Sequence, residues 1–355
     1  MKLKNILLVA LAGVSQLVAM PAYFTATEHS LKQYQVPEWY QDAKLGYWVH
    51  WGIFSVPAHA EGRAASWYGR NMYDSRGVNR ESKIAAYHRA HYGDPKEFGY
   101  KDFVPMWKAE KFDPEAWADL FQEGGAKFFT MLGMHHDNFP LWDSQTTPFN
   151  AANYGPKKDL VAMMEKAIRK RGMRFGLSNH SAWNSRFFEL NHKNKHDVSV
   201  NHHSIYGNAE PNAEDVALWW ARSTEMVEKY HPDLVWFDWC WAVYPYGAQL
   251  RLNFAAWYYN QAILWGMASK QSPEVVIAHK NHLPAGTAVL DFERGGVKDI
   301  HPHVWMNDTS MGIGSWSYEP NDTFRTANQV IDMLIDIVSK NGNLLSIVAK
   351  INIVK

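Results

Sequence analysis

The 355-residue sequence predicts an α/β fold, a (β/α)8 barrel, from two observations. Eight apolar runs of strand length alternate with segments of helical period, an order typical of a parallel sheet with helices between its strands. A chain of this length can also bury one large core, as a single barrel requires. The predicted strands are Leu45–Gly52, Lys127–Met134, Met173–Asn179, Asp233–Trp239, Val275–His279, Ala288–Phe292, His303–Met306 and Asn343–Ala349.

Apolar stripes and start signals mark the helices between these strands. One stripe runs through Leu160, Val161, Met164, Ala167 and Ile168, and another through Val330, Ile331, Leu334, Ile335 and Val338. Asp113-Pro114 opens a helix with proline in its first turn, and Ala213–Lys229 forms a long one. The connection Ile53–Ala126 is longer than a simple βα loop needs, so we expect it to wall part of the active-site cleft.

Composition and the N-terminus narrow the class of protein. The net charge is zero, so the chain lacks the excess of basic residues typical of nucleic-acid-binding proteins. Its 17 tryptophans are several-fold more than the ordinary usage of roughly one per cent. We expect many of these indoles to line a groove, as flat aromatics do in sugar clefts. Residues 1–22 read as a secretory signal peptide, with 27–355 forming the barrel. No later segment is apolar enough to span a membrane, and the sequence predicts a periplasmic or secreted protein with one cysteine, Cys240.

Polar side chains gather where the predicted strands end, the edge at which barrel enzymes carry their active sites. These side chains are His50, His135, His136, His180, Asp238, Asp291, Glu293 and Asp308, with Trp236 and Trp305 beside them. A carboxylate at the rim of a buried strand costs free energy unless it is paired or catalytic. A retaining glycosidase uses two carboxylates on separate strands, about 5–5.5 Å apart, one as the nucleophile and the other as the general acid/base.

Other interpretations of these residues remain open at this point. His135-His136 fits a hydrogen-bonded core pair, Asp238 a rim residue held by an arginine, and Glu293-Arg294 a surface ion pair. Histidine clusters at strand ends also occur in zinc hydrolases, although the H-x-H motif here is His301-Pro302-His303 and no H-E-x-x-H occurs.

Several motifs together resemble the α-L-fucosidases of glycoside hydrolase family 29. They run in the family's order across roughly Trp39–Leu345 and read YWVHWGIFSVPA, WYGRNMY, KFFTMLGMHHDNFPLWDS, FNAANYGPKKDLV, RKRGMRFGL, DLVWFDW and DIVSKNGNLL. The resemblance implies a retaining exo-hydrolase of terminal α-L-fucose that needs no metal and no cofactor. Its partner would be a fucosylated oligosaccharide or polysaccharide, and the oligomeric state is open.

The resemblance also implies roles for individual residues. The nucleophile maps to Asp238, and the general acid/base to Glu293 in an ERG segment, because the matching position of the family's alternative W-E pair is Met306. The predicted substrate-binding residues are His50, Trp67, His135, His136, His180, Trp236, Lys280 and Trp305.

The sequence departs from the family at named positions. Ser66 stands where a glutamate is usual, Ser178-Asn179 where two tyrosines are common, and Lys280 where many members have arginine. The family usually continues into a C-terminal β-sandwich, whereas this sequence ends after SIVAKINIVK. We therefore expect Leu344, Leu345, Ile347 and Val348 to close the barrel against the first strand, without a sandwich. The altered site leaves an α-L-galactosidase or sulfated-fucan hydrolase, and a non-catalytic fucose-binding relative, as alternatives.

Overall fold

The computed structural model describes residues 23–60, 64–74, 81–197, 203–269 and 272–348. The predicted signal peptide and the extreme C-terminus lie outside these residues. Among the described residues, no helix has the length and apolar character needed to cross a membrane.

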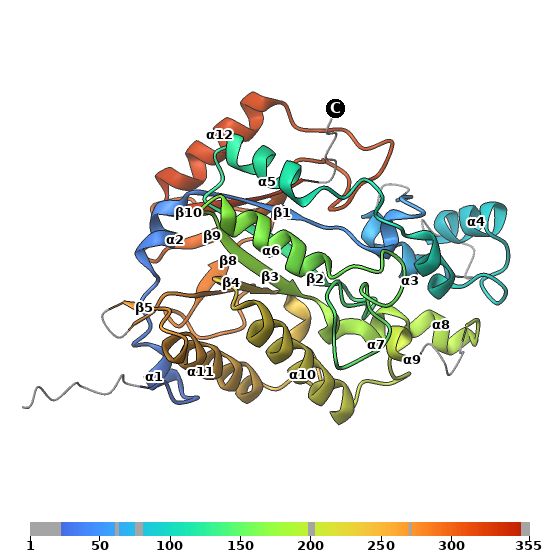
Figure 1. Cartoon of the computed structure of the whole chain (residues 1–355), viewed down its shortest axis with the longest axis horizontal. Helices are drawn as coiled ribbons and strands as arrows, with labels where there is room; N and C mark the ends of the chain where they lie inside the picture. The colour runs from blue at the N-terminus through green and yellow to red at the C-terminus, as the bar shows by residue number, and fades with distance from the viewer. Residues whose placement is uncertain (1–22, 61–63, 75–80, 198–202, 270–271, 349–355) are drawn as a thin grey trace, which may run out of the picture.

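Within this part of the chain, eight parallel strands close into a barrel in the order β1-β10-β9-β8-β7-β4-β3-β2 (Figure 1). The strands are β1 Leu45–Val49, β2 Phe128–Met134, β3 Arg174–Asn179, β4 Leu234–Phe237, β7 Val276–His279, β8 Val289–Asp291, β9 Trp305–Ser310 and β10 Gly342–Ile347. The last strand pairs with the first, placing Leu45 opposite Leu344 and Trp48 opposite Ile347. The predicted barrel and its closure by the C-terminal strand are both confirmed.

Helices surround the barrel and fill the long connections. They are α1 Glu28–Leu31, α2 Glu38–Ala43, α3 Tyr68–Asn71, α4 Glu81–His91, α5 Pro114–Glu123, α6 Leu160–Lys170, α7 Asn184–Phe187, α8 Glu189–Asn194, α9 His203–Tyr206, α10 Ala213–Tyr230, α11 Ala248–Leu264 and α12 Ala327–Ser339. A short antiparallel hairpin pairs β5 Ala268–Ser269 with β6 Ser272–Pro273.

Side-chain caps fix where the longer helices begin. Asp113 accepts a hydrogen bond from the Ala116 amide at the start of α5, and Asp159 does the same for Ala162 in α6. Thr326 and Gln329 form a reciprocal capping box at the start of α12. Each cap satisfies a backbone N–H that has no partner within its helix, which typically stabilises the helix by about 1 kcal/mol.

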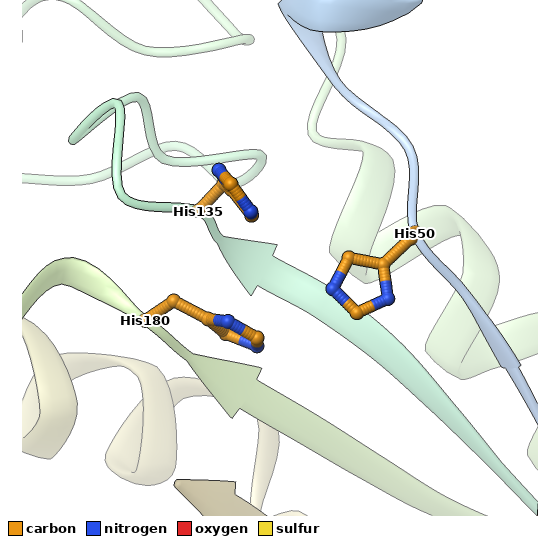
Figure 2. A group of neighbouring side chains, drawn as sticks. All are labelled: His50, His135 and His180. Atoms are coloured by element: carbon orange, nitrogen blue, oxygen red, sulfur yellow. The ribbon is translucent and has the colours of Figure 1, made fainter. Parts of the chain in front are cut away.

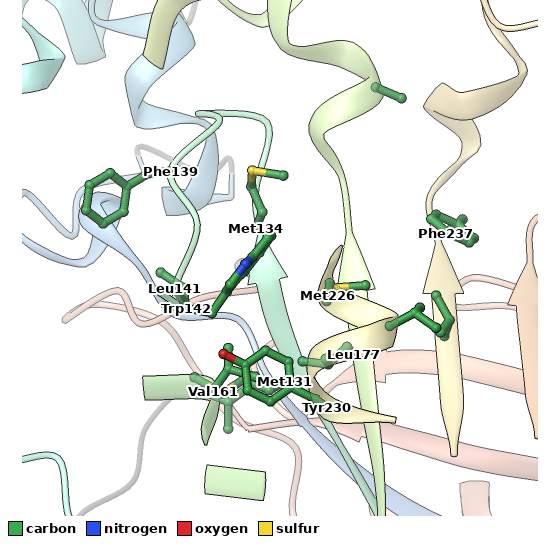
Figure 3. Close-up of a cluster of buried hydrophobic side chains, with 14 of the residues drawn as sticks. Met131, Met134, Phe139, Leu141, Trp142, Val161, Leu177, Met226, Tyr230 and Phe237 are labelled. Atoms are coloured by element: carbon green, nitrogen blue, oxygen red, sulfur yellow. The ribbon is translucent and has the colours of Figure 1, made fainter. Parts of the chain in front are cut away.

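Two apolar layers pack against the barrel strands, one outside the barrel and one inside it. Figure 3 shows the outer layer, in which Met131 of β2 and Leu177 of β3 pack near Val161 of α6 and Met226 of α10. The inner layer fills the barrel, and there Trp48 lies 4.6 Å from Trp236 between ring centroids. Both indoles are buried, so the strand ends above them have a rigid floor.

Strand β9 differs from the prediction. It begins at Trp305, where the sequence suggested that the strand was ending, and it continues through four buried polar residues to Ser310. Trp305 therefore lies at the opposite end of the strand from the active-site edge. Its Nε1 donates to the Lys340 carbonyl (2.8 Å), and Gly342 makes room for the indole, because a Cβ there would come within 2.6 Å of the ring.

Helix α12 presents an apolar face to solvent. Ile331 and Ile335 are 51% and 61% exposed, although they belong to the predicted apolar stripe, and Ile337 is the buried residue of this helix. An apolar stripe left outside the core promotes association with another surface.

We expect this face to pair two copies of the chain in solution. The double substitution Ile331→Lys and Ile335→Glu should then lower the mass measured by light scattering towards that of a monomer, with unchanged activity. Asp332→Lys, on the same helix and already exposed, is the matched control. Equal masses for the wild type and the double variant at all concentrations would contradict this prediction.

Candidate active site

The carboxyl ends of the barrel strands surround a pocket of about 190 Å³. Its walls are formed by His50, Ser66, Trp67, His135, His136, His180, Trp236, Asp238, Trp239, Lys280, Glu293, Asp308 and Trp316. The structure thus brings together nine of the ten predicted site residues. The exception is Trp305, whose assignment to the site is wrong because its side chain is buried at the other end of β9. The pocket is smaller than the roughly 300–1,000 Å³ of drug-sized sites and suits one sugar ring.

Histidines from three adjacent strands form one wall (Figure 2). His50 follows β1, His135 follows β2 and His180 follows β3, with ring centroids 5.3 to 6.0 Å apart. Burial, reinforced by neighbouring histidines, lowers the pKa of His50 and of His135 well below the usual value. Both rings are therefore neutral at physiological pH, and each carries one nitrogen lone pair.

Three ring nitrogens of this wall are buried without a hydrogen-bond partner among the described residues. They are Nδ1 of His50, Nδ1 of His135 and Nε2 of His180. His136 is held differently, because its Nδ1 donates to the His180 carbonyl (2.7 Å) and leaves Nε2 as the acceptor. Burial lowers the pKa of His136 to about 3. Unsatisfied buried nitrogens are costly, so this wall is built to bind a polar ligand.

The same histidines have the spacing of a metal site. One nitrogen each from His50, His135 and His180 lie within 4.8 Å of one another, as do ligand atoms of His136, His180 and Asp238. Neutral imidazoles bind zinc at about 2.0–2.1 Å, and they equally hydrogen-bond sugar hydroxyls.

We expect these histidines to bind sugar hydroxyls and not a metal, because the neighbouring carboxylates Asp238 and Glu293 can supply the chemistry of glycoside hydrolysis without one. Elemental analysis of the purified active protein should then show no stoichiometric zinc, and overnight dialysis against a chelator should leave the rate unchanged. Activity that the chelator removes and zinc restores would overturn this expectation.

Asp238 lies directly after β4 and lines the pocket. Its Oδ1 accepts from the Trp239 amide (2.8 Å) and lies 3.1 Å from the Lys280 ammonium, whereas Oδ2 faces His180 (3.5 Å) and His136 (3.9 Å). Burial opposes ionisation, but Lys280 and His180 outweigh it and hold the pKa of Asp238 well below its usual value. Asp238 is therefore ionised at physiological pH, and Oδ2 is the oxygen with the longer contacts.

Lys280 joins Asp238 to the second predicted carboxylate. Its ammonium lies 2.5 Å from Glu293 Oε2 and 4.9 Å from the Trp236 ring centroid. Burial lowers the pKa of Lys280, but the surrounding carboxylates, Asp238 first, raise it well above the usual value. Because both carboxylates contact the same Nζ, Asp238 Oδ1 and Glu293 Oε2 lie no more than about 5.6 Å apart.

Four indoles give the pocket its apolar surface. Trp236 forms the floor, where its Nε1 donates to Asp291 (2.9 Å), and Trp67 from the long β1–β2 connection stands 5.7 Å from the His136 ring. This connection walls part of the pocket, as predicted. Flat rings of this kind cover the apolar face of a pyranose.

Four of the lining residues are not among the predicted site residues: Ser66, Trp239, Asp308 and Trp316. Trp239 was counted as the last residue of a strand, and Trp316 lies in a loop with no pattern to mark it. Trp316 is held in place by Arg294, whose guanidinium stacks 4.1 Å from its ring centroid. Asp308 was noted as a polar residue near a strand end but was given no role, although it is 2% exposed and lines the pocket.

Comparison with known proteins agrees with this geometry. Residues 12–351 match the family described as Alpha-L-fucosidase. The chain is 31% identical over 345 residues to the tissue alpha-L-fucosidase of Mus musculus, a match that covers 93% of this chain and 68% of the mouse protein. It is 30% identical over 336 residues to the alpha-L-fucosidase of Branchiostoma floridae, with 91% and 67% covered.

A solved structure has the same fold. The crystal structure of Thermotoga maritima alpha-fucosidase in complex with fucose matches with a TM-score of 0.73 and 29% sequence identity, covering 91% of this chain and 70% of that chain. The family match spans the strands that carry the pocket, and the relatives span them as well. The chain therefore belongs to the alpha-L-fucosidase family, family 29 of the glycoside hydrolases.

Proposed function

We propose that the protein is a retaining exo-glycosidase that hydrolyses terminal α-L-fucosyl linkages of oligosaccharides or polysaccharides. The observation that carries the proposal is the pair of carboxylates bridged by Lys280. Asp238 Oδ1 and Glu293 Oε2 lie no more than about 5.6 Å apart, and this close approach supports direct attack by one carboxylate, because inverting enzymes hold their carboxyl groups about 6.5–9.5 Å apart to admit water.

The residues divide the reaction between them. Asp238, ionised and oriented by the Trp239 amide and Lys280, attacks the anomeric carbon and forms a β-linked glycosyl-enzyme. Glu293 gives a proton to the departing glycosidic oxygen and then takes one from the water that releases the sugar. The histidine wall binds ring hydroxyls, and Trp236 and Trp67 cover the apolar faces of the ring. None of these roles calls for a metal or a cofactor.

L-Galactose or a sulfated fucose is a second candidate for the terminal sugar that the enzyme removes. Ser66 lines the pocket where the family usually carries a glutamate, so this chain lacks one hydroxyl acceptor and gains space. L-galactose shares the ring configuration of fucose and adds a hydroxyl at C6, and a sulfated fucose also needs room. A panel of 4-nitrophenyl glycosides tests these possibilities, with α-L-fucoside expected to have the highest kcat/KM. A galactoside preferred tenfold or more would reassign the substrate.

A non-catalytic fucose-binding protein is the alternative from another class. The retained pair argues against it, since hydroxyl binding does not require two carboxylates that contact one buried ammonium, whereas double displacement does require a nucleophile and an acid/base close together. A protein that binds L-fucose in calorimetry yet releases no nitrophenol from any glycoside of the panel would establish that alternative.

We further propose that the protein is exported, because residues 1–22 have the composition of a signal peptide. Mass spectrometry of the protein secreted by its own host should find an N-terminus close to residue 23. A full-length cytoplasmic form with the initiator methionine would contradict export.

A further inference from the structure

The pocket contains a carboxyl group, that of Asp308, that has no role in the proposed reaction. Asp308 sits in the middle of β9, lines the pocket and is 2% exposed. Its Oδ1 is buried with no hydrogen-bond partner among the residues that the structure describes. A carboxyl oxygen left unsatisfied inside a ligand pocket points to a ligand that satisfies it.

Asp308 is held in place by a second aspartate. Its backbone N–H donates to Asp291 Oδ1 (2.9 Å), and Asp291 Oδ2 accepts from the Trp236 indole (2.9 Å). Two N–H donors favour the ionised form of Asp291, whereas Asp308 Oδ1 accepts no hydrogen bond from a described residue, so Asp308 is the carboxyl of the pair that is easier to protonate.

The electrostatics of the pair agree with that placement. Burial and the neighbouring Asp291 raise the pKa of Asp308 well above its usual value. Burial also raises the pKa of Asp291, to about 6. A protonated Asp308 still keeps one carbonyl-type oxygen that can accept a hydrogen bond.

The position of Asp308 limits which part of a sugar it can meet. The Arg294 amide donates to the Asp308 carbonyl (2.9 Å), so Asp308 lies on the strand beside Glu293. Its carboxyl also interacts electrostatically with Lys280, the residue that bridges the two catalytic carboxylates. Asp308 therefore lies on the side of the pocket that carries Glu293 and Lys280, where the proposed reaction puts the anomeric carbon.

We propose that Asp308 is a specificity-determining residue whose carboxyl accepts a hydrogen bond from the sugar hydroxyl nearest the anomeric carbon. In an α-L-fucoside this is the hydroxyl on C2. L-Galactose adds a hydroxyl on C6, on the other side of the anomeric carbon beyond the ring oxygen, and the test distinguishes the two. This inference rests on the proposed glycosidase function. Asp308 would also supply an acceptor for a sugar hydroxyl in a pocket where Ser66 stands in place of the family's usual glutamate.

The test compares Asp308→Ala and Asp308→Asn with the wild type on three substrates: 4-nitrophenyl α-L-fucoside, its 2-deoxy analogue and 4-nitrophenyl α-L-galactoside. Each result is a ratio of kcat/KM between variant and wild type, so the intrinsic reactivity of each substrate cancels. Alanine should cost about 10- to 100-fold on the substrate that carries the contacted hydroxyl, and less than about threefold on the one that lacks it. Asparagine keeps both the acceptor and a donor to Asp291, and should recover most of the loss.

The pattern across substrates identifies the contact. A loss that vanishes for the 2-deoxy sugar places Asp308 on the C2 hydroxyl, and a loss confined to the galactoside places it on the C6 hydroxyl. Equal losses on all three substrates would show a purely structural residue and overturn the inference, with the glycosidase proposal intact. If the wild type cleaves none of them, that proposal fails separately, and calorimetry with free L-fucose and L-galactose decides the inference. Unchanged affinities in Asp308→Ala would then reject it.

Discussion

Asp238→Ala should lower kcat on an aryl α-L-fucoside by about 10⁴-fold or more, the loss typical of a deleted covalent nucleophile. That factor corresponds to about 5 kcal/mol of transition-state stabilisation. The expected size follows from the geometry, because Asp238 is fixed by two donors on Oδ1 and kept ionised by Lys280 inside a buried pocket. Neighbouring Glu293 contacts the same ammonium but follows a different strand, and it cannot replace the missing oxygen.

Azide separates a missing nucleophile from a damaged fold. The small anion can enter the space left by the Asp238 side chain, attack the anomeric carbon of the activated fucoside and give β-fucosyl azide. Asp336→Ala, a carboxylate removed from the exposed side of α12, serves as the matched control and should keep full activity. If Asp238→Ala retains more than a tenth of the wild-type rate, Asp238 is not the nucleophile.

Glu293→Ala should have an effect that depends on the leaving group. A nitrophenolate departs with little protonation, whereas a sugar alcohol needs a proton from the enzyme. We therefore expect a loss of about 10²- to 10⁴-fold on a fucosyl oligosaccharide and a much smaller loss of the first step on the aryl fucoside.

The stereochemistry of azide rescue reports the role of Glu293. Azide needs no general base, so it should intercept the β-linked intermediate on Asp238 and give α-fucosyl azide, the opposite anomer from that of Asp238→Ala. Glu123→Ala, at the exposed end of α5, is a matched control away from the pocket. Equal losses on both substrates, with no azide product, would leave Glu293 a structural role only.

The barrel could be predicted from the sequence because most of its strands are apolar on both faces. β2 and β4 consist entirely of buried residues and read as continuous hydrophobic runs, so their ends, and with them His135 and Asp238, were placed correctly. The Asp113-Pro114 pair predicted the start of α5 in the same way.

β9 could not be predicted because it buries polar side chains. Asn307, Asp308, Thr309 and Ser310 read as a loop, yet hydrogen bonds compensate their burial, as when Asn307 donates to the Phe292 carbonyl (2.8 Å). A hydrophobicity pattern stops at Met306 in such a strand, which put Trp305 at the wrong end and left Asp308 without a role. Trp316 depends on Arg294 stacking across a loop, a tertiary contact that no local pattern encodes.

The pocket walls come from different halves of the chain. The histidines that would bind the sugar all lie between residues 50 and 180, whereas Asp238, Lys280 and Glu293 follow later strands and Asp308 lies within β9. Most of the groups that would bind hydroxyls are thus encoded before the groups that break the bond. His136 and His180 face the Asp238 carboxylate, so their substitution would also affect bond cleavage. His50 and His135, both within the described part of the chain, have no such contact with that carboxylate. A library confined to His50 and His135 is accordingly the economical starting point for changing the sugar that this scaffold accepts.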